Sequence, residues 1–409
     1  MSTANTLFVM VASVLVFFMT PGLAFFYGGL VSQRNSLNTL LSVFFISGLA
    51  IMLWILVGYS LSFRGNVADI TGNLSAFMLH GVKINRLTSN HLPLGVYILF
   101  QMMFAIITPA LFIGAIVGRV RFKFLTVFIV CWSILVYYPL VHMVWGGGLL
   151  AKLGALDFAG GTVVHINAGV TALVLVLLIG PRRHPENQPA NHSWILLGTA
   201  MLWIGWYGFN AGSALAINDI AVQAMMTTTV ATAAAMITWQ LLEVWMAGHV
   251  TLTGTCTGAI CGLVAITPAT GYVSIDSSVW VGLVGAGISF YFVNVIKPRI
   301  KLDDTLDAFG CHGISGIWGS IATGLFASHT INPTVSHDGL LINGSWHLFG
   351  VQLVTTVFTI AWAFLISIVI IKVLDMVMQV RVSQYDEQIG LDLSQHQESL
   401  NSTRLLAEK

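Results

Sequence analysis

Two histidines lie within long apolar segments of the chain. His165 stands near the start of "GGTVVHINAGVTALVLVLLIG" (160–180), and His312 stands between glycines in "DAFGCHGISGIWGSIATGL" (307–325). Imidazole nitrogens donate or accept hydrogen bonds, and the ring can relay a proton. Ionisable side chains inside membrane segments are costly and usually mark a pathway for an ion or a proton. We therefore expect these two rings to act on a small polar solute.

Two other interpretations of the histidines compete with this one. A single histidine in a membrane helix can bond a neighbouring carbonyl across a packed interface, although a second histidine in a corresponding segment makes that less favoured. A metal site would need more ligands, and Cys311 points about 100° away from its neighbour His312 on a helix. Glu243, in "WQLLEVW", has no spacing that joins it to either ring. The sequence therefore predicts no metal site and no cofactor.

The composition places these segments in a membrane. Of the 409 residues, 56% are hydrophobic and 8% are charged, whereas a soluble domain has about 25% charged residues. The mean hydropathy is +0.85. The net charge of +1, without a basic run, argues against a nucleic-acid partner. The cysteines lack zinc-finger or disulfide spacing and are interpreted as small packing residues: Cys131, Cys256, Cys261 and Cys311.

Apolar runs of roughly 20 residues, the length that crosses a bilayer, recur along the chain. The first run has no basic flank and is too long for a cleavable signal peptide. We therefore predict an all-α membrane protein with eleven transmembrane helices, at residues 7–31, 36–63, 95–118, 122–145, 161–180, 193–216, 219–246, 252–272, 278–297, 307–327 and 345–378.

Lysines and arginines set the expected orientation, because they are more frequent in cytoplasmic loops. With the N-terminus outside, the inner loops carry nine of them: Arg34, Arg119, Arg121, Lys123, Arg182, Arg183, Lys297, Arg299 and Lys301. The outer loops carry four: Arg64, Lys83, Arg86 and Lys152. This predicts an N-out, C-in topology, with a transmembrane domain over residues 1–378 and a cytoplasmic tail over 379–409.

The histidine segments also indicate an internal repeat. His165 follows Asp157 by eight residues, and His312 follows Asp307 by five. If helices 1–5 and 6–10 form an inverted repeat, the histidines lie on equivalent helices, the fifth and the tenth. The two rings would then meet near the pseudo-twofold axis.

Four stretches resemble the bacterial ammonium transporters of the Amt family, and the resemblance covers nearly the whole chain. They are "TPGLAFFYGGL" (20–30), "HMVWGGGLLAKLGALDFAGGTVVHINAG" (142–169), "IGWYGFNAGSA" (204–214) and "DAFGCHGISG" (307–316). The resemblance implies a multi-pass protein of the cell membrane, inner or plasma, surrounded by lipid. It also implies a homotrimer in which every subunit has its own pore.

The resemblance implies an outer recruitment site and a gate beneath it. Phe104, Trp145 and Ser213 match the family's recruitment site, where aromatic faces attract a cation and a hydroxyl accepts a hydrogen bond. Phe100 could complete this wall, or it could simply pack against Phe104. Phe104 and Phe209 match the stacked pair that closes the pore. Without the resemblance, each phenylalanine would be interpreted as ordinary packing.

The remaining site residues follow from the same resemblance. His165 and His312 match the family's twin pore histidines, which would share one proton between them. Asp157 matches the acid at the pore entrance, and two roles stay open for it: attracting a cation or accepting its proton, and capping the fifth helix. Asp307 is expected to be structural, at the inner end of the tenth helix. Two further aromatics are weaker candidates for the vestibule: Tyr137 and Trp206.

The sequence departs from the family pattern at two positions and carries one residue that separates the family's branches. Cys311 occupies a position that is often aliphatic in the family, and Ser383 stands where relatives commonly have proline. Trp145 favours the Amt branch over the Rhesus-type branch, which usually lacks an aromatic there. We expect a regulatory protein of the PII type to contact the tail.

The predicted function is that of an ammonium transporter rather than an enzyme. The protein would recruit ammonium or methylammonium, remove its proton, and conduct ammonia with separate proton transfer. The alternative is an ammonium sensor of the same fold that signals through its tail, although about 30 residues are few for an output domain. An intramembrane enzyme is least favoured, because no nucleophile or metal set accompanies the histidines.

Overall fold

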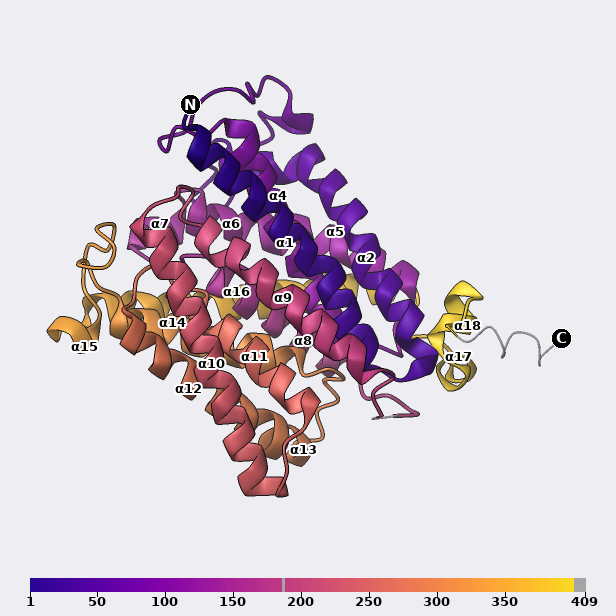
Figure 1. Ribbon diagram of the computed structural model, residues 1–409. Helices are drawn as coiled ribbons and strands as arrows, with labels where there is room; N and C mark the ends of the chain where they lie inside the picture. The colour runs from indigo at the N-terminus through magenta and orange to yellow at the C-terminus, as the bar shows by residue number, and fades with distance from the viewer. Residues whose placement is uncertain (186–187, 401–409) are drawn as a thin grey trace.

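The computed structural model describes residues 1–185 and 188–400, which form a bundle of helices joined by loops (Figure 1). Within those ranges the only β-type pairings are isolated bridges. Helices dominate because an apolar segment must satisfy its backbone N–H and C=O groups internally when water is excluded. The prediction of an all-α protein is confirmed.

Helical segments occupy the ranges that the sequence predicts, often with a short turn of π- or 3₁₀-helix, labelled η, at a bend. Three short helices, near residues 77–79, 149–153 and 340–343, lie outside those ranges. Their bounds are α1 (Thr3–Leu30), η1 (Gln33–Asn35), α2 (Ser36–Leu53), η2 (Trp54–Gly58), α3 (Tyr59–Phe63), η3 (Phe77–Leu79), α4 (Leu94–Leu111), η4 (Phe112–Ala115), α5 (Phe122–Trp132), η5 (Ser133–Tyr137), α6 (Tyr138–Trp145), α7 (Leu149–Leu153), η6 (Gly161–Ile166), α8 (Asn167–Ile179), α9 (His192–Gly212), α10 (Asp219–Ala247), α11 (Leu252–Ile266), α12 (Ile275–Tyr291), η7 (Phe292–Ile296), α13 (Lys297–Arg299), η8 (Phe309–Ile314), α14 (Ser315–Phe326), α15 (Leu340–Asn343) and α16 (Trp346–Val377).

Among the described residues, eight helical segments are long and apolar enough to cross a membrane. The segments at α9, α11 and η8–α14 are helical but are not among these eight. The count of eleven crossings therefore stays a prediction. Helix α11 ends at Ile266 rather than at residue 272, because Pro268 follows and has no N–H to continue the hydrogen-bond ladder.

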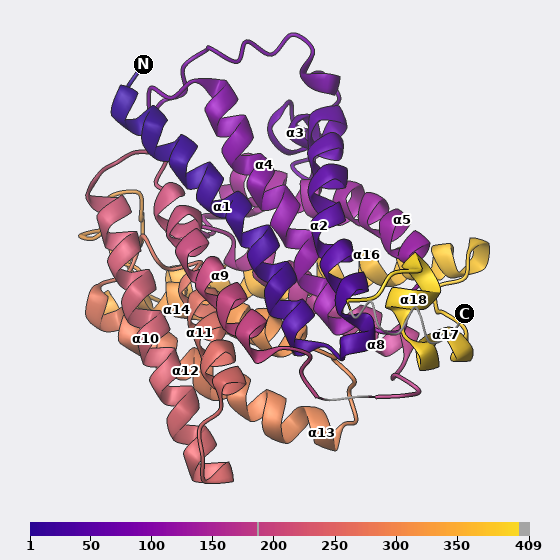
Figure 2. The same cartoon turned by 45° about the vertical axis from the view of Figure 1, so that its right-hand side comes forward.

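Close helix packing builds the bundle. Helix α1 lies along α9, α10 packs against α11 and α12, and α16 packs against α8 and α14 (Figures 1 and 2). At the α1–α9 contact, a β-carbon on Gly198 would collide with the backbone of Phe26. Small residues let two backbones approach closely where lipid supplies no hydrophobic drive for association. The short π-helices η6 and η8 are held inside this bundle, against α14 and α8.

The C-terminal segment folds back onto one end of the bundle. After α16 it forms α17 (Gln384–Ile389) and α18 (Leu391–His396). Figure 2 shows these helices in yellow, at the far end of the bundle from the N-terminus. Residues 401–409 of the predicted tail lie outside the described residues, and the predicted domain division at residue 378 stays a prediction.

Specific contacts hold the tail in place. The Asp392 carboxylate accepts hydrogen bonds from the backbone N–H groups of Leu37 (3.1 Å) and Asn38 (2.7 Å), so it caps the first turn of α2. Arg381 forms a 2.9 Å ion pair with the buried carboxylate of Glu387. Ser383 begins α17 with a reciprocal capping box, which is the role that a serine performs well at a helix N-terminus. The tail is therefore packed against the loops that the charge pattern predicts to be cytoplasmic.

Candidate functional site

A cavity of about 340 Å³ collects all the predicted recruitment residues. Its walls include Phe100 and Phe104 from α4, Trp145 from the end of α6, Ser213 at the C-cap of α9, and Asp157 from the loop before η6. These side chains come from four separate parts of the chain. Helix packing therefore brings together residues that the sequence could associate only through a family resemblance.

The cavity presents aromatic faces and a hydroxyl in fixed positions. The Trp145 indole N–H donates to the Asp157 carbonyl oxygen at 2.9 Å, and the ring meets Phe104 nearly at right angles, with centroids 5.7 Å apart. The Ser213 hydroxyl donates to the Phe209 carbonyl at 2.8 Å. Its hydrogen is thus engaged while its oxygen lone pairs can still accept. Such a site suits a cation that carries N–H donors.

A stacked pair of phenylalanines closes the floor of this cavity. The rings of Phe104 and Phe209 lie 4.3 Å apart between centroids, with an angle of 28° between their planes. Both side chains are fully buried. Phe104 on α4 lines this cavity and Phe209 on α9 lines the narrow cavity described next, so the stacked pair lies between the two.

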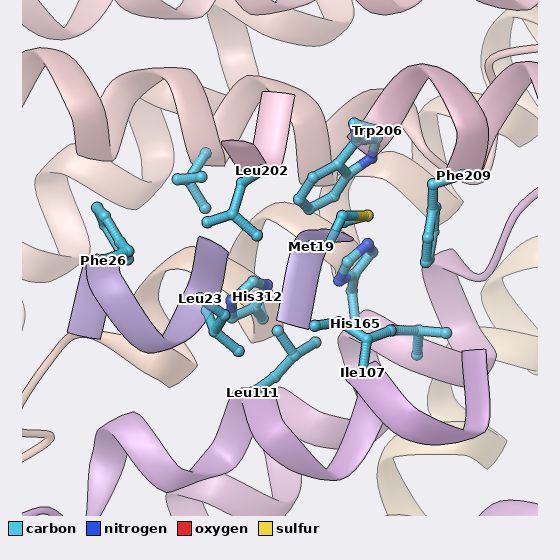
Figure 3. A pocket seen from close by; sticks show the side chains of 12 residues that line it. Met19, Leu23, Phe26, Ile107, Leu111, His165, Leu202, Trp206, Phe209 and His312 are labelled. Atoms are coloured by element: carbon cyan, nitrogen blue, oxygen red, sulfur yellow. The ribbon is translucent and has the colours of Figure 1, made fainter. Parts of the chain in front are cut away.

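A narrow apolar cavity lies beneath the phenylalanines (Figure 3). Its volume is about 10 Å³, which is space for about one water molecule. Figure 3 shows it bounded by Phe209 at one end and Phe26 at the other, with both histidines between them. The other lining side chains are apolar or aromatic: Met19, Leu23, Ile107, Leu111, Val164, Leu202, Trp206 and Ile260.

The two histidines supply the polar atoms of this cavity. His165 lies on η6 and His312 on η8, their ring planes are 11° apart, and their centroids are separated by 5.4 Å. Neither ring nitrogen of His165 has a hydrogen-bond partner among the described residues, and neither does Nδ1 of His312. The rings are thus side by side, as predicted, but their shared proton stays a prediction. Unpaired buried nitrogens are available to a solute.

Close backbone contact and aromatic packing position the rings. A β-carbon on Gly169 of α8 would collide with the backbone of Gly313, so the two histidine-bearing segments cross there at close range. Trp206 stacks on His165 with centroids 5.3 Å apart, and its indole N–H donates to Thr267 at 2.9 Å. Trp206 therefore lines the pore cavity and not the vestibule, where it was a weaker candidate.

Tyr137, the other weaker candidate, does not line the vestibule either. It stacks on Trp132 with centroids 5.9 Å apart, within the bundle. Both aromatics were placed wrongly because hydropathy does not reveal the depth of a side chain or the rotation of its helix about its own axis.

Asp157 caps the histidine-bearing helix η6. Its Oδ1 accepts from the N–H groups of Gly160 (2.8 Å) and Gly161 (2.7 Å), and its Oδ2 accepts from those of Thr162 (2.9 Å) and Val163 (3.2 Å). The Thr162 hydroxyl also donates to Oδ2. These contacts are those of a structural cap. A role as proton acceptor would have to compete with five hydrogen bonds.

Asp304 occupies the corresponding position on the second histidine segment. Its carboxylate accepts from the N–H groups of Ala308 (3.0 Å) and Phe309 (2.7 Å), at the start of η8. Asp304 precedes His312 by eight residues, which is the spacing of Asp157 and His165. This shared spacing is present in the sequence, although Asp307, five residues before His312, is the acid compared with Asp157 above. Asp307 is structural in another way, because it forms an ion pair with Lys297.

A wider cavity of about 550 Å³ opens below the histidines. Its walls include Phe26, Arg182, Lys297, Asp304, Asp307 and Cys311. Burial, followed by the charge of neighbouring Asp307, raises the pKa of Asp304 to about 6. This cavity therefore contains a carboxyl group that changes charge not far below neutral pH.

The structure assigns a local role to Glu243. Glu243 accepts from the backbone N–H (3.0 Å) and the hydroxyl (2.7 Å) of Thr251, so it supports the N-cap of α11. In the part of the chain that the structure describes, no group of three or more His, Cys, Asp or Glu side chains is arranged to hold a metal ion.

Comparisons of sequence agree with this arrangement. The model of the Ammonium Transporter Family matches residues 7–400. The chain is 42% identical to an ammonium transporter of Bacillus subtilis, over 97% of this chain and 98% of that protein. It is 40% identical to the ammonium transporter Amt1 of Archaeoglobus fulgidus, over 97% of this chain and 99% of that protein. These relatives are named as transporters and not as enzymes.

Comparisons of structure extend the similarity. The crystal structure of Saccharomyces cerevisiae Mep2 matches with a TM-score of 0.87 and 32% identity, over 93% of this chain and 88% of that one. A structure named Sensor Amt Protein matches with a TM-score of 0.87 and 26% identity, over 96% of this chain and 98% of that one.

Proposed function

Because the chain belongs to the ammonium transporter family, we propose that it carries ammonium nitrogen across the cell membrane along the pathway described above. The order of features along this pathway supports the proposal most strongly. An aromatic cavity with a hydroxyl acceptor leads to a closed phenylalanine pair, then to an apolar cavity with two histidines, and then to a polar mouth.

The outer cavity recruits the cation. Ammonium has four N–H donors and one positive charge, and an aromatic face stabilises such a cation by about 0.5–2 kcal/mol. Trp145 and Phe104 provide the faces, Phe100 completes the wall, and the Ser213 oxygen accepts one N–H bond. The cation waits here until the stacked pair of Phe104 and Phe209 opens.

The apolar cavity passes ammonia and stops the bare cation. A charged solute that enters a space for about one molecule loses its water shell, at a cost of many kcal/mol. Ammonium avoids this cost by giving up its proton. Ammonia then moves past His165 and His312, whose unpaired ring nitrogens offer hydrogen bonds, while the proton travels separately through the histidine pair or an associated water chain.

The topology and assembly belong to the same proposal. Eleven crossings with the N-terminus outside place the basic loops and the tail in the cytoplasm. The opposite positions of the N-terminus and the tail along the bundle support an odd number of crossings (Figure 2). By family resemblance the protein is a homotrimer with one pore per subunit, and light scattering of the purified protein in detergent measures this.

Current measurements on proteoliposomes test the proposed function. A pulse of ammonium or methylammonium should evoke an inward current in vesicles that contain the protein, and should not in empty vesicles. Correctly folded, reconstituted protein that carries no current and takes up no methylammonium would contradict transport.

Replacing Trp145 with leucine should raise the half-saturation concentration for ammonium and methylammonium by about 2- to 30-fold, the range that corresponds to a lost cation–π contact. The maximal flux should change less, because the pore histidines remain. Trp318→Leu is a matched control, since the Trp318 indole also donates to a backbone carbonyl (Val281, 3.0 Å) but lies outside the vestibule. An unchanged half-saturation concentration in Trp145→Leu would mean that this ring only packs.

A sensor is the second candidate function, and the similarity to the Sensor Amt Protein favours it. A sensor would bind ammonium in the outer cavity without sustained flux. Binding measured by a shift in tryptophan fluorescence, combined with absent current in the same preparation, would favour this alternative.

A PII-type nitrogen-regulatory protein from the same host should bind the inner face of the transporter and block the inner exits of the pores. The tail is expected to form part of that face, because it is docked on the inner loops through Asp392. Copurification under varied effector nucleotides measures this binding. Absence of binding under every nucleotide condition, with normal transport, would count against the partner.

The Asp392→Ala variant tests how much the docked tail contributes to binding of the PII-type protein. Loss of a helix cap costs about 0.5–2 kcal/mol, so the tail should be cleaved faster by a protease and should retain less of the PII-type protein. Glu398→Ala, at an exposed position in the same tail, is the control and should behave like the native chain.

A further inference from the structure

Two histidines outside the pore meet at the surface of the bundle. His337 lies in the loop between α14 and α15, and His347 lies in the first turn of α16. Their ring centroids are 4.0 Å apart, with an angle of 38° between the ring planes. Both residues are exposed, and among the described residues neither ring forms a hydrogen bond. The ring nitrogens of this pair are therefore open to a ligand from solvent.

The loop that carries His337 also borders the recruitment cavity. Asn332 and Thr334, from the same loop, line the cavity of about 340 Å³ that contains the aromatic recruitment residues. The two ends of the loop are joined, because the Gly339 N–H donates to the Ala327 carbonyl oxygen at 2.7 Å. The histidine pair thus connects a closed loop, one wall of the cavity, to the start of α16.

We propose that His337 and His347 form a two-nitrogen binding site for a divalent transition-metal ion of the Cu²⁺ or Zn²⁺ class. Neutral imidazole suits these ions, whereas Mg²⁺ and Ca²⁺ prefer oxygen ligands. Two protein ligands leave the other coordination positions to water, so the ion should bind reversibly. The part of the chain that the structure describes has no group of three or more ligating side chains, and a water-completed pair does not need one.

The distance between the rings is close to the distance that a bound ion requires. Metal–nitrogen bonds of about 2.0–2.1 Å hold the centroids of two imidazoles on one ion about 4.5–5 Å apart. From their 4.0 Å contact, the rings need to separate by roughly 1 Å, which exposed side chains achieve by small rotations about their χ angles. Two metal–nitrogen bonds then replace two metal–water bonds, without a change of oxidation state and without loss of a proton from the neutral rings.

A bound ion would fasten the loop to α16. Without the ion, the loop can open locally, because a contact between two exposed rings contributes little stability. With the ion, backbone amides in the loop should exchange hydrogen for deuterium more slowly. A wall that moves less should also slow the entry of solute into the cavity. This effect on entry rests on the proposed function, whereas the metal site does not.

Cu²⁺ is the probe, because it binds nitrogen ligands more tightly than the other divalent first-row ions and its paramagnetic resonance spectrum reports coordinated nitrogens. It is added to the full-length protein in detergent, at neutral pH in a non-coordinating buffer. The native chain should bind one Cu²⁺ through two nitrogens, and deuterium exchange in residues 328–339 should slow. His337→Ala and His347→Ala, both at exposed positions, should each fold, weaken this binding at least tenfold and abolish the slowing.

A double variant at two other exposed histidines is the matched control. His80→Ala/His91→Ala changes the loop between α3 and α4, and it should bind Cu²⁺ like the native chain. Mg²⁺, added in place of Cu²⁺, should bind neither protein at this site and should not slow deuterium exchange.

The outcomes separate the site from its consequences. The site is overturned if the native chain binds no Cu²⁺, if both pair variants bind it as tightly, or if the control variant loses as much binding as they do. Pair-dependent binding without slower exchange supports the site and contradicts the fastening of the loop. Copper that slows methylammonium uptake in the native chain and in the control, but not in the pair variants, supports the site and its effect on entry. Pair-dependent binding in a protein without any ammonium current leaves the site supported and contradicts the proposed function.

Discussion

Replacing His165 with aspartate, or His312 with glutamate, should make the pore conduct potassium, which the native protein excludes. Potassium and ammonium have similar size and equal charge, so an outer site of aromatic faces and one hydroxyl cannot separate them well. Selection must therefore occur deeper, at the apolar cavity. Ammonium can leave its proton behind there and continue as ammonia, and potassium has no equivalent step.

The acidic variants lower the free-energy cost of bringing a bare cation into the apolar cavity. A neutral imidazole pair supplies too few acceptors to offset the desolvation of a bare cation. A carboxylate in the same place supplies a full negative charge a few ångströms from the ion, and the attraction is strong where water is excluded. We expect potassium current to rise from background to a level comparable with the ammonium current.

Growth of a potassium-uptake-deficient host and potassium current in proteoliposomes measure this effect. His165→Asn and His312→Gln are matched controls, because they are polar and uncharged and should not admit potassium. Native protein that already carries potassium would contradict deprotonation as the source of selectivity. So would acidic variants that reach the membrane and still exclude potassium.

Replacing Asp157 with alanine should abolish most transport and lower stability together. The carboxylate holds the first turn of η6 through four backbone N–H groups and one hydroxyl. Loss of such a cap leaves buried donors unpaired, at a cost of roughly 2–5 kcal/mol. We expect methylammonium uptake to fall more than tenfold, and the midpoint of thermal unfolding to fall as well.

Asp304→Ala tests whether capping is the reason. Asp304 caps η8 through two backbone N–H groups, whereas Asp157 caps η6 through four and a hydroxyl, and Asp304 lines the other large cavity. If capping explains both residues, both variants should lose stability and uptake, and Asp304→Ala should lose less of each. If Asp157 accepts the proton of ammonium, Asp157→Asn should lose uptake without a drop in unfolding midpoint, and Asp304→Asn should keep its uptake. Unfolding of the reconstituted variants, followed by tryptophan fluorescence, distinguishes the two cases.

Hydropathy and charge alone determined the class of protein and the places of its helices. Each predicted range lies within a few residues of a helical segment, apart from α11, where Pro268 ends the helix early. The short helices in the loops and in the tail were not predicted. Helix positions can be predicted in this way because the backbone N–H and C=O groups of an apolar membrane segment must bond to one another within that segment. The spacing of Asp157 and His165, repeated by Asp304 and His312, was also present in the sequence.

The family resemblance named the vestibule residues, and only the tertiary structure decided how side chains from different helices meet. It placed Trp206 in the narrow cavity with the histidines rather than in the vestibule, and it made Asp304 the cap of η8. These relations depend on the rotation and depth of each helix. The rotation and depth of a helix depend on where small residues allow two backbones to cross, as at Gly169. The sequence of one segment does not identify the segment that packs against it.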